Sequence, residues 1–111
     1  MEERRKEPRS VISFPVACDF LPRRSYFYTV CKDLSYGGIR IITNNFIPRG
    51  HLLKINLNLI DKIIDVKAKV MWCNKERFAD RYHAGLRFIE VGDTDKTYLK
   101  GFVTTTHKKH Y

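Results

Sequence analysis

The sequence contains no long apolar run, and this absence limits the kinds of protein it can be. The chain of 111 residues has no hydrophobic stretch approaching the roughly 20 residues that a membrane-spanning helix requires. Its N-terminus is charged from residue 2 onward, with no apolar segment behind the charges, so it does not resemble a signal peptide. We therefore expect a cytoplasmic protein that does not insert into membranes.

Cysteine is also scarce, with three residues, Cys18, Cys31 and Cys73, and no C-x-x-C pair. An odd, widely spaced set favours buried free thiols in a reducing compartment over a disulfide framework. The four histidines lack the spacing with cysteine or carboxylate partners that a zinc site needs. No grouping of serine, histidine and acid in the sequence marks a nucleophilic centre. The sequence thus predicts no metal site, no catalytic residues and no enzyme.

Acidic residues are in the minority, because 21 lysines and arginines face 12 aspartates and glutamates and the net charge is +9. This excess favours anionic partners such as nucleotides, nucleic acid or acidic protein surfaces. The first ten residues carry a net charge of only +1, since three glutamates offset four cations. A plain nucleic-acid-binding arm lacks such acidic residues as a rule, so we do not expect nucleic acid as the main partner.

Alternating apolar residues predict an all-β chain with six strands. The period of two covers residues 12–20, 53–59, 66–72 and 82–89, and residues 25–32 and 39–43 have the composition of strands. Turn signals at short intervals are typical of an antiparallel barrel or sandwich. A sheet of this size has to close or cover its edges, which favours a barrel. Trp72 has the core-facing parity of its strand, so core packing is its first interpretation and a position with the ring edge near a ligand is the second.

A helix is predicted from Asp93, where the apolar period changes. Tyr98, Leu99, Phe102 and Val103 form its apolar stripe, and the threonine run at 104–106 is expected to end it. The expected organisation is a flexible basic tail at residues 1–10, a barrel with a C-terminal helix at 11–106, and a basic tail at 107–111.

Two short motifs carry chemistry suited to an anionic ligand with purine edges. The first lies in the N-terminal tail, where Arg5 and Arg9 have the spacing R-x-x-x-R and Arg4 directly precedes them. Arginine binds phosphate oxygens in a bidentate manner, and the same fork matches O6 and N7 of guanine. The second motif is DLSYGG at residues 33–38, between two predicted strands. It offers a carboxylate, a hydroxyl and glycine backbone at a turn.

In this order, the R-x-x-x-R and D-x-S-x-x-G motifs resemble the two-part signature of PilZ domains. PilZ domains are six-stranded antiparallel β-barrels with a C-terminal helix that bind cyclic di-GMP, a bacterial second messenger. The resemblance spans nearly the whole chain and includes the segment GLRF at residues 85–88. It implies a PilZ-type β-barrel fold and cyclic di-GMP as the ligand, without a metal.

The resemblance implies a role for each motif residue, and donor and acceptor chemistry supports it. Asp33 is suited to accept hydrogen bonds from guanine N1–H and N2–H, and Ser35 to donate to a phosphate or accept from a base amine. Gly37 and Gly38 remove side chains where ligand and backbone approach closely. Arg87 has outward parity and is within reach of a phosphate, although a solvated strand arginine is the alternative.

The resulting hypothesis is a single-domain cyclic di-GMP receptor that signals to a protein partner. Ligand binding orders the N-terminal tail over the barrel, and the new surface is what a partner reads. The resemblance suggests motility, polysaccharide or secretion machinery as the effector, without choosing among them.

Two alternatives stay open at this stage. One is a small β-barrel that binds single-stranded nucleic acid, supported by the net charge and by Tyr26, Phe27 and Tyr28, whose rings can stack on bases. The other is a ligand-free PilZ-like adaptor that holds another protein. The presence of Arg5, Arg9 and the motif carboxylate argues against this second alternative.

Overall fold

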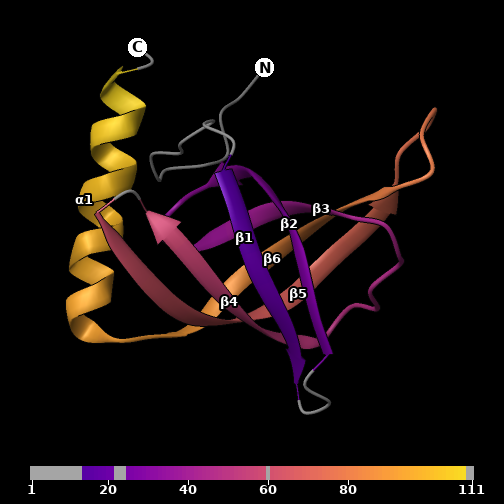
Figure 1. The fold of residues 1–111 in the computed structure, drawn as a ribbon, viewed down its shortest axis with the longest axis horizontal. Helices are drawn as coiled ribbons and strands as arrows, with labels where there is room; N and C mark the ends of the chain where they lie inside the picture. Colours follow the sequence, from indigo (N-terminus) through magenta and orange to yellow (C-terminus); the bar gives the residue numbers. More distant parts are fainter. Residues whose placement is uncertain (1–13, 22–24, 60, 110–111) are drawn as a thin grey trace.

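The computed structural model describes residues 14–21, 25–59 and 61–109 and shows a β-barrel with one helix beside it (Figure 1). Its elements are, in chain order, β1 (Phe14–Leu21), β2 (Ser25–Leu34), β3 (Gly38–Thr43), β4 (Leu52–Leu59), β5 (Lys62–Lys75), β6 (Tyr82–Val91) and α1 (Asp93–Lys109). The strands close in the order β1-β2-β3-β6-β5-β4, and every neighbouring pair is antiparallel. The predicted six-stranded barrel with a C-terminal helix is confirmed.

Strict alternation fills the barrel with aliphatic side chains. In β4, Leu53, Ile55, Leu57 and Leu59 are buried while their neighbours reach the outer surface. Buried apolar side chains of the other strands join them in one packed core. At roughly 1.5–3 kcal/mol for each fully buried aliphatic side chain, this core is the main source of stability.

Helix α1 packs on the barrel with its predicted apolar stripe. Leu99 and Val103 are buried, and they lie one helical turn apart on the same face. The first half of the helix is also held by the β4–β5 turn, because Lys62 Nζ lies 3.2 Å from Asp95 Oδ1. Within the described part of the chain, no helix is long and apolar enough to cross a membrane.

The helix runs to Lys109, so the prediction that the threonine run at 104–106 ends it is wrong. Threonine lowers helix propensity by a few tenths of a kcal/mol without removing a backbone hydrogen bond, as proline would. Packing of Val103 against the barrel holds the preceding turn, and the backbone continues in the same conformation.

Three register shifts interrupt the strand pairs, between Cys31 and Asp33, between Lys67 and Ala68, and between Val70 and Trp72. A β-bulge places an extra residue in one strand and therefore turns the following side chains to the opposite face. The third shift moves Trp72 out of the core-facing row, and its side chain is 39% exposed. The prediction that Trp72 packs in the core is wrong for this reason.

The thiols of Cys18 and Cys31 are fully buried and reduced, as predicted. Burial raises the pKa of each to about 12, since the thiolate is poorly solvated inside the barrel.

We expect both thiols to resist a thiol-specific reagent at pH 8 in the folded protein, whereas the half-buried Cys73 reacts first. Mass spectrometry after brief alkylation measures this order; early labelling of Cys18 or Cys31 would contradict the described core.

Candidate functional site

The five predicted ligand-binding residues that the structure describes lie where β2, β3 and β6 meet. They are Asp33, Ser35, Gly37, Gly38 and Arg87. The three arginines of the N-terminal motif, Arg4, Arg5 and Arg9, lie outside the described residues. Their convergence on this corner, and the ordering of the tail, stay predictions.

Ser35 holds the turn between β2 and β3 together. Its Oγ accepts hydrogen bonds from the backbone N–H groups of Gly37 and Gly38, at 3.2 and 3.1 Å. The Ser35 N–H donates to the Gly38 carbonyl oxygen at 2.9 Å. The side chain therefore acts in the manner of an ST turn, which gives it a structural function in addition to any contact with a ligand.

Gly38 is required by the neighbouring strand. A Cβ atom at this position would lie 2.5 Å from the carbonyl oxygen of Leu86 on β6. Gly38 pairs with Arg87, and the Gly37 carbonyl accepts a hydrogen bond of 3.0 Å from the N–H of Phe88. The second glycine thus lets the turn close against β6, whereas sequence reasoning assigned it to close approach of the ligand alone.

The bulge in β2 decides where Asp33 points. Plain alternation from the buried Cys31 would direct Asp33 into the barrel, but the extra residue Lys32 places it opposite Arg40 instead. Opposite residues of an antiparallel pair share a face, so the carboxylate lies on the outer side with the Arg40 side chain. Asp33 is nonetheless 5% exposed, which means that its surroundings largely remove it from water.

The pair of Asp33 and Arg40 is part of a row of paired residues that continues over neighbouring strands, on the outside of the barrel, to Trp72. Arg40 pairs with Gly85 on β6, and Gly85 pairs with Trp72 on β5. The indole lies directly on Gly85, because a Cβ atom there would collide with the ring atoms Nε1 and Cε2. Two bulges on separate strands therefore bring a carboxylate, a guanidinium and an indole into one row on the outer surface, Asp33–Arg40–Gly85–Trp72.

A second row beside it is cationic. Gly38 pairs with Arg87, and Arg87 pairs with Lys69 on β5. Arg87 is exposed and Lys69 half-buried, both on the outer face of the barrel. The two rows together offer positive charge next to donors and acceptors with defined positions, as recognition of a phosphate-bearing base requires.

Arg40 is linked to the β5–β6 loop through a histidine. Its Nη1 lies 3.5 Å from His83 Nδ1, and His83 Nε2 lies 2.7 Å from Glu76 Oε2. Hydrogen bonds from Arg81 and then from His83 hold the pKa of Glu76 below its usual range. The Nε atom of Arg40 is buried without a hydrogen-bond partner among the described residues.

Sequence reasoning did not assign Arg40 or Lys69 to the site, and its first interpretation placed Trp72 in the core. Arg40 carried a usable signal, since it lies two residues after Gly38 and therefore shares its face of β3. The sequence around Trp72 gave no signal of its outward direction, because the bulge before Trp72 depends on how β5 pairs with β6.

The aromatic residues that favoured nucleic acid lie at the other end of β2. Tyr26 and Tyr28 are 61% and 81% exposed, and Phe27 packs on Phe20 with ring centroids 5.2 Å apart. At about 3.3 Å per residue, Tyr26 is roughly 23 Å along the strand from Asp33. These rings belong to a surface separate from the two rows.

Comparison with known proteins identifies the family. The family model of the PilZ domain matches residues 3–105. This chain belongs to the PilZ domain family. A search of the curated proteins gave no match at the significance level applied.

Solved PilZ structures share the fold at low sequence identity. Bacillus subtilis MotI/DgrA, an inhibitor of motility, superposes with a TM-score of 0.85 at 16% identity over 99% of this chain and 54% of its own. The PilZ domain of Escherichia coli YcgR with c-di-GMP gives 0.73 at 18% identity over 97% and 95%. The MrkH–c-di-GMP complex of K. pneumonia gives 0.77 at 13% identity over 98% and 55%. The chain thus spans about half the length of MotI and MrkH.

Proposed function

We propose that this PilZ domain is a receptor for cyclic di-GMP that binds it with the R-x-x-x-R and D-x-S-x-x-G motifs and passes the signal to a protein partner. The observation that carries the proposal is the outward-facing Asp33–Arg40–Gly85–Trp72 row beside the Gly38–Arg87–Lys69 row. The presence of c-di-GMP in the solved complexes of YcgR and MrkH, members of the same fold, supports the choice of ligand.

Each part of the ligand has a chemically matched group on this surface. The Asp33 carboxylate accepts from the guanine N1–H and N2–H groups, and the unpartnered Nε of Arg40 donates to a phosphate or to guanine O6. The exposed indole of Trp72 offers a stacking face for a base. Arg87 and Lys69 balance the two phosphate charges, and Arg5 and Arg9 of the tail add the bidentate contacts that lysine cannot make.

Signalling follows from ordering of the N-terminal motif against this surface. The tail and the barrel are both cationic, so the tail gains little by packing on the two rows without an anion between them. With cyclic di-GMP bound, Arg4, Arg5 and Arg9 obtain anionic partners, and the tail folds over the ligand. The partner then recognises the combined surface of tail and barrel.

Isothermal titration calorimetry of the full chain with cyclic di-GMP tests the proposal. We expect saturable heat with the wild type, and affinities lower by on the order of 10- to 100-fold for Arg5→Ala and Asp33→Asn, since each loses hydrogen bonds to a charged group. Arg77→Ala is the matched control, because Arg77 is exposed in the β5–β6 loop and its guanidinium lies over the Phe78 ring at 5.3 Å. It should bind as the wild type does.

Other outcomes would favour the alternatives. Tight binding of single-stranded oligonucleotides that weakens steeply with salt, without response to cyclic di-GMP, would support a nucleic-acid-binding barrel. No heat at millimolar cyclic di-GMP would leave the ligand-free adaptor as the better account.

A further inference from the structure

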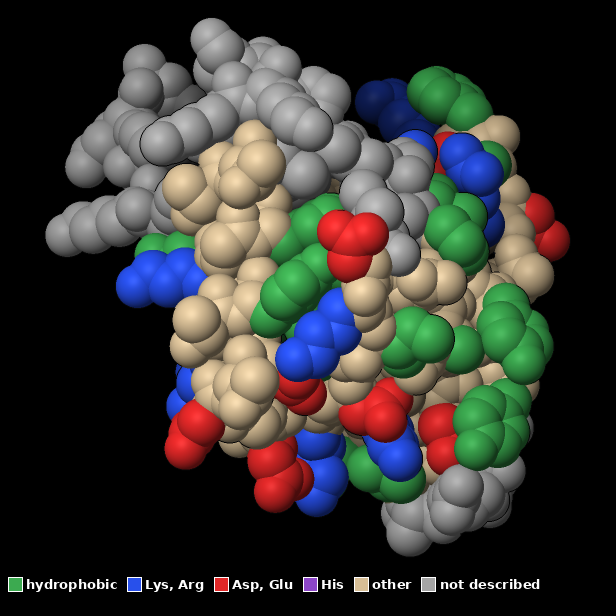
Figure 2. All heavy atoms as spheres, turned by 60° about the vertical axis from the view of Figure 1, so that its left-hand side comes forward, with side chains coloured by type: hydrophobic (Ala, Val, Ile, Leu, Met, Phe, Trp, Pro, Cys, Tyr) green, Lys and Arg blue, Asp and Glu red, His purple; other side chains and the backbone are tan. Residues whose placement is uncertain are grey.

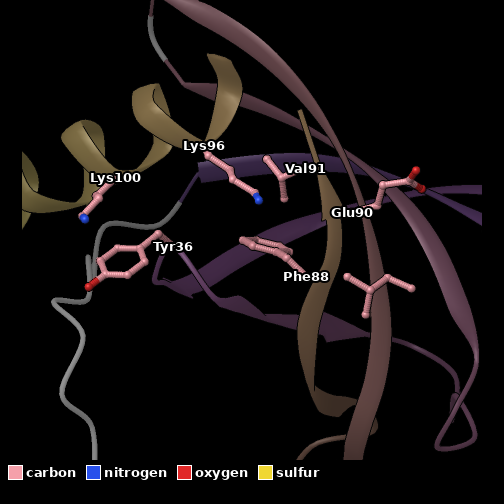
Figure 3. A pocket seen from close by; sticks show the side chains of 7 residues that line it. Tyr36, Phe88, Glu90, Val91, Lys96 and Lys100 are labelled. Atoms are coloured by element: carbon pink, nitrogen blue, oxygen red, sulfur yellow. The ribbon is translucent and has the colours of Figure 1, made fainter. Parts of the chain in front are cut away.

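A groove lies between α1 and the end of β6, next to the DLSYGG turn. Its volume is about 420 Å³. It is lined by Lys96 and Lys100 of α1, by Phe88 and Val91 of β6, and by Tyr36 of the turn. Figure 3 shows Lys96 extending toward Phe88 and Val91, and Lys100 lying beside Tyr36. Tyr36 is the residue between Ser35 and Gly37, so this groove and the candidate nucleotide site share the same turn.

The groove combines an apolar floor with cationic groups. Phe88 and Val91 are half-buried, and Ile89 beside them is 45% exposed. Figure 2, which turns the helix side forward, shows hydrophobic side chains reaching the surface beside lysine or arginine side chains. Lys96 and Lys100 are exposed and four residues apart, so they lie on one face of α1.

The two lysines have no acidic partner among the described residues. Glu90 is the acidic residue that lines the groove, but its carboxylate is 3.1 Å from Lys67 Nζ and points away from the helix (Figure 3). Lys100 instead lies over the Tyr36 ring, with Nζ 5.4 Å from the ring centroid. Anionic groups of an occupant would therefore meet two ammonium groups that form no ion pair with a carboxylate of the described residues.

We propose that this groove is the docking site for an acidic segment of the partner protein that carries a large apolar residue. The apolar residue packs on Phe88 and Val91, and flanking carboxylates pair with Lys96 and Lys100. A nucleotide fits less well, since the described lining offers no arginine fork and lysine acts as a point charge. The net charge of +9 favours association of an acidic partner with the molecule as a whole, and the two lysines favour this groove.

The Tyr36–Lys100 contact couples this groove to the turn. A ligand that moves the turn displaces the Tyr36 ring and thereby the Lys100 ammonium that lies over it. This coupling depends on the proposed function, whereas docking of the acidic segment does not. The two sites are then linked thermodynamically, so each occupant changes the affinity of the other by the same factor.

Selection from a displayed library of random peptides on the immobilised full chain tests the docking site. We expect the enriched peptides to combine Asp or Glu with a large apolar residue. Their affinity, measured by fluorescence anisotropy, should fall at least ~10-fold in the double variant Lys96→Glu, Lys100→Glu, because like charges then face each other. Lys54→Glu makes the same type of charge change on the exposed outer face of β4 and should leave the affinity unchanged.

No enrichment, peptides without acidic residues, or equal binding to the double variant would each overturn the docking site.

Saturating cyclic di-GMP should alter the peptide affinity at least ~5-fold in the wild type and much less in Tyr36→Leu. An unchanged affinity in the wild type, with calorimetry showing that cyclic di-GMP binds, would overturn the coupling. If calorimetry shows no binding of cyclic di-GMP, the proposed function fails while the peptide result still decides the docking site.

Discussion

Replacing Gly38 by alanine should lower the free energy of unfolding by roughly 1–3 kcal/mol, as overpacking of a closed site does. The added methyl would lie 2.5 Å from the Leu86 carbonyl oxygen, which is backbone within the β3–β6 ladder and cannot rotate away as a side chain can. Relief requires β3 and β6 to separate at Arg87, which also displaces the turn that carries Ser35. Urea denaturation measures the change, and calorimetry should show weaker nucleotide binding in the same variant.

Gly101→Ala is the matched control for this prediction. Gly101 lies within α1, and a Cβ atom there would meet nothing within 4 Å. Alanine should therefore raise the free energy of unfolding by about 0.5–1 kcal/mol through its higher helix propensity, without affecting the ligand site. Equal stability of Gly38→Ala and the wild type would contradict the close approach of the turn to β6.

Replacing Arg40 by alanine should weaken cyclic di-GMP binding by on the order of 100-fold. The guanidinium faces the same outer surface as Asp33, and its Nε has no hydrogen-bond partner among the described residues. A bound anion that reaches this group therefore adds a hydrogen bond that the free protein lacks. Hydrogen bonds to charged groups contribute about 1.5–3 kcal/mol each, and 1.4 kcal/mol corresponds to a tenfold change in affinity. Calorimetry measures the change.

Conservative substitution separates the geometry of Arg40 from its charge. Arg40→Lys keeps the charge but loses the planar fork, so we expect it to recover part of the affinity and remain about tenfold weaker than the wild type. Arg77→Ala again controls for the loss of one positive charge. Thermal unfolding should confirm that each variant is folded, and full affinity in folded Arg40→Ala would remove Arg40 from the site.

The barrel was predictable because its inner face follows simple alternation. Leu53, Ile55, Leu57 and Leu59 repeat every second residue along β4, and a chain of this length buries them by closing the sheet. The strand order was not predictable from periodicity, since β6 lies between β3 and β5 through contacts distant in sequence. The end of α1 was misplaced for a related reason, because packing of Val103 outweighed the propensity of the threonines.

The site was predictable where it depends on a local motif and unpredictable where it depends on bulges. The sequence DLSYGG at residues 33–38 predicts a turn that carries a carboxylate, because its serine and glycines favour a turn by local interactions alone. The outward direction of Asp33, however, follows from the register shift after Cys31, and that of Trp72 from the shift after Val70. A bulge is set by how two strands pair, so one strand's own sequence does not reveal it.

A titration of the ¹⁵N-labelled chain with cyclic di-GMP, followed by ¹H–¹⁵N correlation spectra, tests most directly whether the outer surface at β2, β3 and β6 receives the nucleotide. We predict that the largest shifts occur at the amides of Gly37 and Gly38 and at the Trp72 indole N–H, while Tyr26 and Tyr28 are unaffected. Shifts centred on the two tyrosines, or no shifts at millimolar ligand, would contradict the proposed site.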